Sequence, residues 1–378
     1  MNNKYTLIID GSYFLYRALY VNPGVIRNNE ILYSEKEVAV YIRKLAIDLA
    51  YQIRLFDGLV NDVVWTVDSR SWRKDIFPES DYKGNRKKNK KINWDNFKKA
   101  SNIFTDIIEN LGAHVSKVDG AEADDLVYAW SINKDNAIIF SGDKDLIQLI
   151  DNFTIFYSPV HSKIYSDFNF NDWLESNDED EDVDIFSALK IDNSKHAFKG
   201  IIKNNNLDVI PVNSDLFRLK KIITGDKGDN VPPAYWKKVN NRTFGISEAK
   251  ADKIIERFIG DDEFNYLSLY NEDDLAKLAS IIIQVMNVRD KVLSDIVKNL
   301  KTNMSLMILD NRSIPNNIVD DMFSLVEESI ETKKINIKDF YHMNTMLKDT
   351  PYVNQNDDTI SSVFDGDDDL DDFSFIVD

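Results

Sequence analysis

Three aspartates follow short apolar runs that have the composition of buried β-strands. Asp10 comes after TLII, Asp68 after VVWTV, and Asp143 after AIIFSG. Ligands of parallel α/β proteins bind at the carboxyl ends of the strands, so these carboxylates are expected to converge in one crevice. The alternative for any one of them is an ordinary turn or helix-capping residue.

Further acids come in tight groups. They are Glu122, Asp124 and Asp125 in GAEADDL, Asp145 in SGDKD, and Asp226 and Asp229 in GDKGDN. The first group alone is explained equally well by the preference for acids at a helix start. Together, however, so many carboxylates would repel one another and raise their pKa values unless cations neutralised them. An all-oxygen ligand set suits magnesium or manganese, and two such ions can hydrolyse a phosphodiester.

The composition agrees with a site of this kind. The 378 residues include no cysteine, which excludes disulfides, zinc-thiolate sites and iron-sulfur clusters. The four histidines lie far apart, and none has the i, i+4 spacing of a helical zinc site. Metal sites built from oxygen ligands therefore remain the expected kind.

The formal net charge of -18 seems to argue against a nucleic-acid partner. Two segments explain it. Residues 172–184 carry eight acids, residues 357–378 carry nine, and neither segment has a basic residue. The rest of the chain is nearly neutral, so its electrostatics depend on local clusters.

One such cluster is residues 82–99, which hold eight basic residues and one acid, with Tyr82, Trp94 and Phe97 interleaved. Cations for phosphates and aromatic faces for unstacked bases are the components of a single-strand channel. The alternative is a solvated loop that leads into a charged helix. The lysines expected to contact nucleic acid are Lys87, Lys88, Lys90 and Lys91.

A weaker basic excess covers residues 217–253, with nine basic and four acidic residues. Within it, Gly245 is predicted to form a turn before a helix that begins near Ser247. Backbone amides at such a helix start can hold a phosphate without reading sequence.

The elements that must position these residues follow from periodicity. Val- and Ile-rich runs at 5–9, 62–67, 136–140 and 154–157 predict strands, and 35–56 and 95–111 predict amphipathic helices. This alternation indicates an α/β fold with a mostly parallel sheet covered by helices. Later segments at 214–225, 247–259, 273–300 and 316–332 predict a helical region. We therefore divide the chain into an α/β domain at 1–170, an acidic insert at 171–185, a helical region at 186–350 and a disordered acidic tail at 351–378.

Six segments in this order resemble the structure-specific 5′-nucleases, a family that includes flap endonucleases, and most closely its T-even-type bacteriophage branch. They are LIIDGSYFLYRALY (7–20), VVWTVD (63–68), DYKGNR (81–86), GAEADDL (120–126), FSGDKDL (140–146) and GDKGDNVP (225–232). The resemblance implies a PIN-like 5′-nuclease fold, with segment 80–100 as the basic arch or clamp. It also implies a helix-hairpin-helix-type region that grips duplex DNA.

The resemblance also assigns roles to residues. The first metal ion is assigned to Asp10, Asp68, Glu122 and Asp124, and the second to Asp143, Asp145 and the pair Asp226 and Asp229. Asp125 is a ninth implied ligand that is assigned to neither ion in particular. Lys83 is expected to contact the scissile phosphate and stabilise developing charge. Arg86 is expected to assist it, Tyr82 to stack on the terminal base pair and Arg17 to contact phosphate. Where the family continues quickly to a Gly-Ile-Gly-Pro-Lys hairpin, this chain inserts PAYWKKVNNRTF and then reads GISEAKA. Lys250 is expected to replace the usual lysine.

The implied activity is that of a magnesium-dependent 5′-nuclease, with manganese as a possible substitute, that removes RNA primers and 5′ DNA flaps. Its expected substrates are branched or nicked DNA and RNA–DNA hybrid, which it would cut as exonuclease, flap endonuclease and ribonuclease H. No signal peptide and no membrane span is recognisable, so a cytoplasmic monomer is expected, in the host cell if the gene is a phage's. The alternatives are a catalytically silent DNA-binding protein and a PIN-type ribonuclease.

The tail VFDGDDDLDDFSFIVD ends in apolar residues after a run of acids. Phe373, Phe375 and Ile376 suggest a short peptide that docks on a sliding clamp or a single-strand-binding protein. The alternative is a solubilising or nucleic-acid-mimicking tail.

Overall fold

The computed structural model describes residues 4–21, 25–27, 30–78, 81–176, 192–240, 242–260, 264–332 and 335–343. Most of the acidic insert and the whole tail lie outside these residues. The predicted docking residues Phe373, Phe375 and Ile376 therefore lie outside the described part of the chain and stay a prediction.

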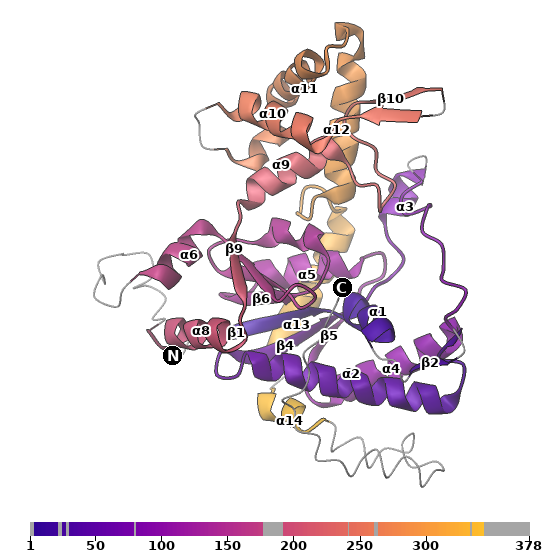
Figure 1. Ribbon diagram of the computed structural model, residues 1–378, viewed down its shortest axis with the longest axis vertical. Coiled ribbons are helices and arrows are strands. Elements are labelled where there is room, and N and C mark those ends of the chain that lie inside the picture. The colour runs from indigo at the N-terminus through magenta and orange to yellow at the C-terminus, as the bar shows by residue number, and fades with distance from the viewer. Residues whose placement is uncertain are drawn as a thin grey trace.

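A seven-stranded sheet forms the centre of the protein (Figure 1). Its strand order is β5-β4-β1-β6-β7-β8-β9, and each neighbouring pair is parallel except β7 with β8. The strands are β1 (Tyr5–Asp10), β4 (Val60–Thr66), β5 (His114–Ser116), β6 (Ala137–Phe140), β7 (Thr154–Ser158), β8 (Lys163–Ser166) and β9 (Asp208–Pro211). The predicted α/β class, the mostly parallel sheet and the four predicted strands are confirmed.

Two cores cover the two faces of this sheet. All six residues of β1 are buried, as expected for a central parallel strand with helices on both sides. Leu7 and Ile9 belong to one core and Ile8 to the other, because successive side chains point to opposite faces. The first core is built with α1 (Gly11–Val21), α2 (Glu35–Leu55), α4 (Trp94–Asn110), α6 (Phe168–Glu175), α8 (Asp192–Asn204) and α14 (Ile337–Tyr341). The second is built with α5 (Ala123–Ile132), the 3-10 helix η3 (Lys144–Leu149) and α13 (Asn316–Thr332).

A third core belongs to a helical region at the top of Figure 1. Its helices are α9 (Ser214–Thr224), α10 (Glu248–Ile259), α11 (Glu272–Met286) and α12 (Leu293–Met307), with short 3-10 turns η4 (Tyr266–Tyr270) and η5 (Asp290–Val292). The segment 273–300, predicted to be helical, is divided between α11 and α12. The chain leaves α11 at Asn287, whose φ of 51° is left-handed, and α12 starts afresh six residues later.

The packing does not follow the predicted division at residue 170. Strand β9 pairs with β8 and so completes the sheet, although it lies within the predicted helical region. Helix α13 packs on α5 and α14 packs on α2, which returns the chain to the α/β part (Figure 1). Residues 186–350 therefore contribute both to the sheet and to the separate helical core.

Two small antiparallel hairpins and one short helix complete the fold. They are β2 (Ile26–Arg27) with β3 (Glu30–Ile31), β10 (Trp236–Val239) with β11 (Arg242–Gly245), and α3 (Arg73–Ile76). None of the helices in the described residues is long and apolar enough to cross a membrane.

Candidate active site

The carboxyl ends of β1, β4 and β6 bring the first acids together, as predicted. Asp10 is 4% exposed and accepts hydrogen bonds from the Tyr13 N–H at 2.9 Å and the Ser141 hydroxyl at 2.8 Å. The same Ser141 oxygen accepts from the Asp143 N–H at 3.0 Å, so one hydroxyl joins the ends of β1 and β6. Asp68 accepts from the Ala123 N–H at 2.8 Å and so joins the end of β4 to the start of α5.

These acids perturb one another. Burial, together with the charges of Asp68 and Asp143, raises the pKa of Asp10 to about 7. Burial and the charges of Asp143 and Asp10 also hold the pKa of Asp124 well above its ordinary value. Carboxylates from β1, β4, α5 and the turn after β6 therefore share one electrostatic environment.

A second group of acids surrounds the ammonium of Lys221 on α9. This side chain is 8% exposed; it contacts Asp145 and lies 3.2 Å from Asp226. Burial raises the pKa of Asp145 to about 6, although Lys221 opposes the rise. Burial also opposes ionisation of Asp226, but Lys221 and two backbone N–H donors outweigh it and lower the pKa of that carboxyl.

Glycine is required at the start of the turn that presents Asp226. Gly225 ends α9 with a φ of 67°, a left-handed conformation that side chains disfavour. A Cβ there would lie 2.5 Å from the Val231 carbonyl oxygen. The turn is closed by two backbone hydrogen bonds between Asp226 and Val231, of 2.8 and 2.7 Å.

A second turn, residues 81–85, docks on this one and delivers Lys83. The Lys83 N–H donates to the Asp229 carbonyl at 2.9 Å. The Lys83 ammonium contacts Glu122 and lies 3.9 Å from the Asp229 carboxylate. Arg86 contacts the same Asp229, and its side chain is 57% exposed. Lys83 therefore links the α5 acids to the acids of residues 226–231.

Asp125 does not join the acid cluster. It is fully buried, and its two oxygens accept from the Arg73 guanidinium at 2.8 and 3.0 Å. Its Oδ2 also accepts from the Trp72 ring N–H and the Glu122 N–H. A carboxylate held by four donors in this way is structural, so we remove Asp125 from the predicted ligand set.

Two further predicted roles do not fit the positions of the side chains. Tyr82 is 7% exposed and donates its hydroxyl to Glu122 at 3.1 Å, so its ring is covered where stacking on a base pair was expected. Arg17 lies 2.6 Å from Asp48 in a largely buried ion pair, which occupies the guanidinium that was expected on a phosphate.

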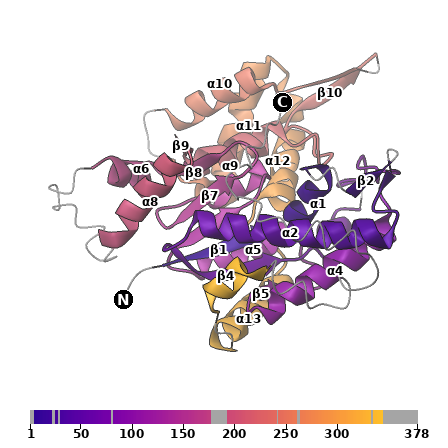
Figure 2. The ribbon, with the colours of Figure 1, turned by 60° about the horizontal axis from the view of Figure 1, so that its bottom comes forward.

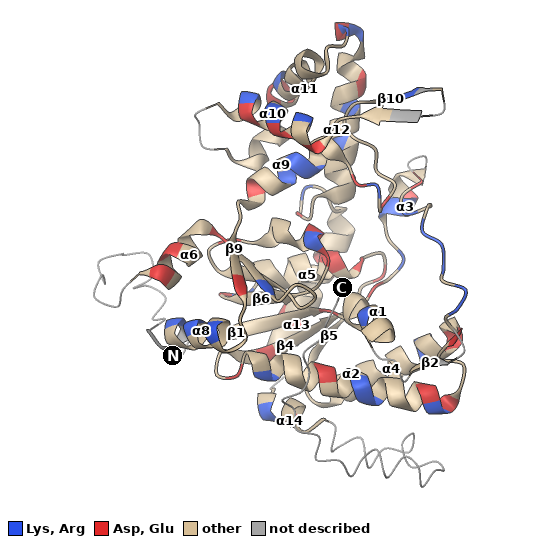
Figure 3. Ribbon diagram, in the orientation of Figure 1, with Lys and Arg blue, Asp and Glu red and all other residues tan. Residues whose placement is uncertain are grey.

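The basic segment lies on the surface, where both a phosphate-binding strip and a solvated loop are expected. Basic residues run along the connection between α3 and α4, at the right of Figure 3. Lys87, Lys88, Lys90 and Lys91 are all exposed. The exposed aromatic rings beside this strip come from α1. Tyr16 and Tyr20 are 42% and 48% exposed, and Tyr16 stacks on Trp94 with ring centroids 6.4 Å apart.

The predicted helix start after Gly245 is also present. Ser247 caps α10, but its hydroxyl makes no capping hydrogen bond, and Lys250 is exposed in the first turn. Both features leave this helix start open to an anion.

The donor chemistry of the acid cluster fits a hard divalent cation. Only carboxylates contribute, and the raised pKa values of Asp10, Asp124 and Asp145 indicate that the protein alone does not neutralise these three fully. Among the described residues, however, no three acidic or histidine side chains are close enough to enclose one ion. Lys83 and Lys221 instead link acids of different segments.

Sequence reasoning missed two cations of this site. Arg73 is 2% exposed and anchors both Asp125 and Glu122, and Lys221 links Asp145 to Asp226. Arg73 stands five residues after Asp68, and Lys221 five before Asp226. Closeness to a predicted ligand is the only signal that could have found them.

Residues 5–175 match the model of the family described as "5′-3′ exonuclease, N-terminal resolvase-like domain". This match confirms the predicted resemblance to the 5′-nucleases over that part of the chain. A curated relative, the 5′-3′ exonuclease of Mycoplasmopsis pulmonis, is 30% identical over 204 residues, which are 52% of this chain. The match covers 61% of that relative's length, less than two thirds of it.

Solved structures show weaker likeness. The T5 5′-exonuclease with divalent zinc ions is 16% identical, with a TM-score of 0.49 and coverage of 86% of this chain and 99% of the other. The bacteriophage T5 D15 flap endonuclease, solved with DNA and metal ions, is 15% identical, with a TM-score of 0.46 and coverage of 87% and 100%. The catalytic core of Rad2 with DNA substrate is 13% identical, with a TM-score of 0.35 and coverage of 91% and 93%. At these values the likeness transfers no ligand and no residue role.

Proposed function

We propose that this protein is a divalent-metal-dependent 5′-nuclease that cuts branched DNA and RNA–DNA hybrid. The observation that carries the proposal is the electrostatic interaction among four carboxylates at the carboxyl ends of the parallel strands, those of Asp10, Asp124, Asp143 and Asp145. Burial and mutual repulsion raise the pKa values of Asp10, Asp124 and Asp145. Carboxyl groups perturbed in this way do not help to stabilise a fold, and they are typical of functional sites. The family match of residues 5–175 supports the reaction class.

Magnesium, with manganese as a substitute, is the proposed cofactor. The residues that would hold it are Asp10, Asp68, Glu122, Asp124, Asp143, Asp145, Asp226 and Asp229. When bound, a pair of such ions supplies Lewis acidity and positive charge for phosphodiester hydrolysis.

The chain's own cations have a separate task. Lys83 and Arg86 both contact Asp229, on the side of the acids nearest the basic segment. A DNA phosphate that enters there would meet their fixed positive charge, which stabilises the extra negative charge of the transition state. Lys221, which is more deeply buried, keeps Asp145 and Asp226 oriented.

The proposed path of the substrate follows the charge of the surface. The exposed lysines of segment 80–100 would hold the phosphates of the 5′ single strand, with Tyr16 and Tyr20 beside them as stacking surfaces. The α10 helix start with Lys250 would hold the duplex. Removal of RNA primers and of 5′ flaps in replication are the proposed biological reactions.

Cleavage of end-labelled 5′-flap DNA, beside an RNA–DNA hybrid, tests the proposal. We expect cleavage with magnesium and none with EDTA. We expect Asp143→Asn to slow cleavage by about 100-fold or more, the scale for loss of one group of a preorganised charged site, while binding is kept. Full activity of that variant would overturn the site assignment. Tight DNA binding without cleavage by the wild type would favour the catalytically silent binder.

A further inference from the structure

The β10–β11 hairpin projects from the helical region, beyond the third core (Figures 1 and 2). Its base is fixed. Ala234 and Ile246, on either side, are buried in that core, and the Ala234 carbonyl accepts from the Asn299 side chain at 3.0 Å. The two strands therefore form a firmly rooted projection.

The two aromatic rings of this hairpin are exposed. Trp236 is 43% and Phe244 is 50% exposed, and both lie outside the core that buries their neighbours. A two-stranded hairpin is marginal by itself, and these rings would stabilise the fold more if they were turned inward. Large apolar side chains held in solvent on a projecting element are typical of a binding surface.

Lysines accompany the rings on both faces. Lys237 is paired with Phe244 across the strands, so these two side chains share one face. Trp236 and Lys238 alternate with them and share the other. Residues 231–247 contain three basic residues and no acid. Among the described residues, neither Lys237 nor Lys238 has an ion-pair partner.

The position of the hairpin in the chain indicates that its partner is a polyanion. It connects the turn that carries Asp226 and Asp229 to the α10 helix start at Ser247, two parts of the proposed DNA-binding surface. Figure 1 shows it on the same side of the molecule as α3 and the basic connection to α4. A polyanion bound at either part would lie beside these lysines, whose charge is complementary to phosphate.

We propose that the hairpin formed by β10 and β11 is a DNA-contacting element. Trp236 or Phe244 stacks on an unpaired or terminal base next to the strand junction, and the lysine on the same face, Lys238 beside Trp236 or Lys237 beside Phe244, pairs with a phosphate of the same strand. This proposal rests on the proposed function in one respect, because the ligand is taken to be the branched DNA that the nuclease would cut. It adds a contact for unpaired bases that the acid cluster and the basic segment do not supply.

Binding of fluorescent 5′-flap DNA in EDTA tests this inference without any need for cleavage. The variant is the full chain with Trp236→Ala and Phe244→Ala. The matched control is Phe168→Ala, which removes a ring that is 52% exposed on α6. We expect the double variant to bind flap DNA roughly 5- to 150-fold more weakly, the range for loss of one stacked base, and to bind plain duplex with a smaller change. Equal flap affinity in the double variant and the control would overturn the proposal.

A second measurement separates stacking from simple loss of charge or of folding. A 2-aminopurine placed at the flap junction should be quenched by the wild type and by Lys237→Ala, and should stay bright with the double variant at saturating protein. Quenching that persists in the double variant would overturn the stacking role. If the wild type binds and quenches but never cleaves, the proposed nuclease function fails while the hairpin inference stands.

Discussion

The ammonium of Lys221 lies 3.2 Å from the carboxylate of Asp226, inside the protein and between two segments of the acid cluster. It also contacts Asp145, so a single cation on α9 ties the 3-10 helix η3 to the turn after α9. A lysine in this place neutralises part of a cluster that burial would otherwise keep protonated. It therefore favours the ionised forms of Asp145 and Asp226.

Replacing Lys221 with methionine should raise the pKa of Asp145 above its present value of about 6. The reason is that Lys221 is the largest influence that lowers this pKa, while burial raises it. Carbon-13 NMR titration of the aspartate carboxyls in metal-free protein measures the shift. Lys220→Met is the matched control, because Lys220 lies on the same helix but pairs with exposed Glu248 and Asp252. An Asp145 that titrates alike in both variants would contradict the proposed role.

Lys83→Ala should reduce the rate of the chemical step more than the affinity for DNA. Lys83 is largely buried between Glu122 and Asp229. In the proposed function its charge would act on the reacting phosphate and would contribute little to the long surface that holds the strand. We expect single-turnover cleavage to slow by about 10²- to 10³-fold, with a change in affinity below about tenfold. Lys87→Ala, on the exposed strip, should show the opposite pattern. Unchanged single-turnover rates for Lys83→Ala would refute the assignment.

The sheet and most of the acids were predictable because each depends on local sequence. Apolar runs that end in aspartate define strands β1 and β4 and the turn after β6, and the strand ends of a parallel sheet must meet. The role of Lys221 was not predictable, because Lys220 and Lys221 are adjacent and only the packing of α9 decides which is buried. The same holds for Tyr82, since a tyrosine in a basic segment can equally well face a base or cover an ion pair.

Asp124 and Asp125 are adjacent in sequence, yet they should respond in opposite ways to removal of their charge. Asp125→Asn breaks the bidentate pair with buried Arg73, so we expect a loss of about 3–5 kcal/mol in the free energy of unfolding. Asp124→Asn removes a carboxyl whose charged form is disfavoured by desolvation and by neighbouring acids, so stability should be kept or increased.

For manganese affinity, we expect the Asp124→Asn variant to be more affected than the Asp125→Asn variant, the opposite of their effects on stability. Asp124→Asn should weaken binding, and Asp125→Asn should leave it nearly unchanged while the protein is folded. Urea unfolding and a manganese titration, each made on both variants, measure the two effects. Weak manganese binding by a folded Asp125→Asn protein would return Asp125 to the ligand set.

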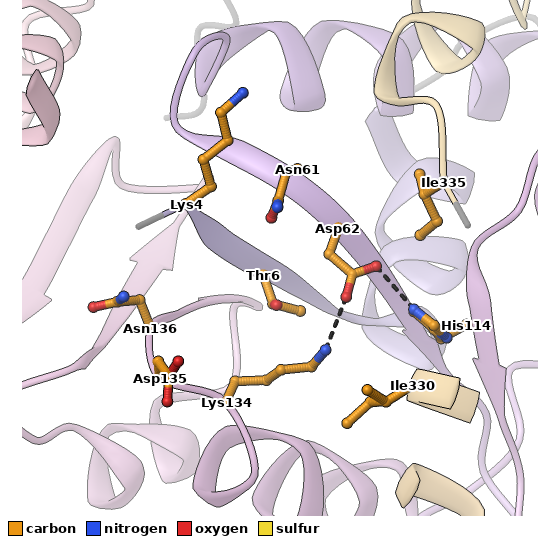
Figure 4. A pocket seen from close by; sticks show the side chains of 10 residues that line it. All are labelled: Lys4, Thr6, Asn61, Asp62, His114, Lys134, Asp135, Asn136, Ile330 and Ile335. Atoms are coloured by element: carbon orange, nitrogen blue, oxygen red, sulfur yellow. Dashed lines mark hydrogen bonds and ion pairs between the residues drawn. The ribbon is translucent and has the colours of Figure 1, made fainter. Parts of the chain in front are cut away.

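Asp62 forms an ion pair with Lys134 and a hydrogen bond with His114 beside a polar cavity of about 290 Å³ at the amino ends of β1 and β4 (Figure 4). Its two oxygens lie 2.9 Å from the His114 Nε2 and 2.9 Å from the Lys134 Nζ. Burial would raise the pKa of Asp62, but these two partners outweigh it and lower the pKa below its ordinary value of 3.8. The stabilisation is therefore fully present above pH 3.8 and is lost as the pH falls through the lower pKa of the folded protein.

Asp62→Asn should consequently lower the free energy of unfolding at neutral pH by about 2–3 kcal/mol, the scale of hydrogen bonds to charged groups. The difference from the wild type should shrink in strongly acidic buffer, because the wild-type carboxyl is then protonated as well. Urea unfolding across this pH range measures both effects. Asp135→Asn is the control, since Asp135 lines the same cavity but is exposed and makes no ion pair among the described residues. A stability difference between Asp62→Asn and wild type that does not change with pH would show that the asparagine disturbs packing, and that the charge of Asp62 contributes nothing.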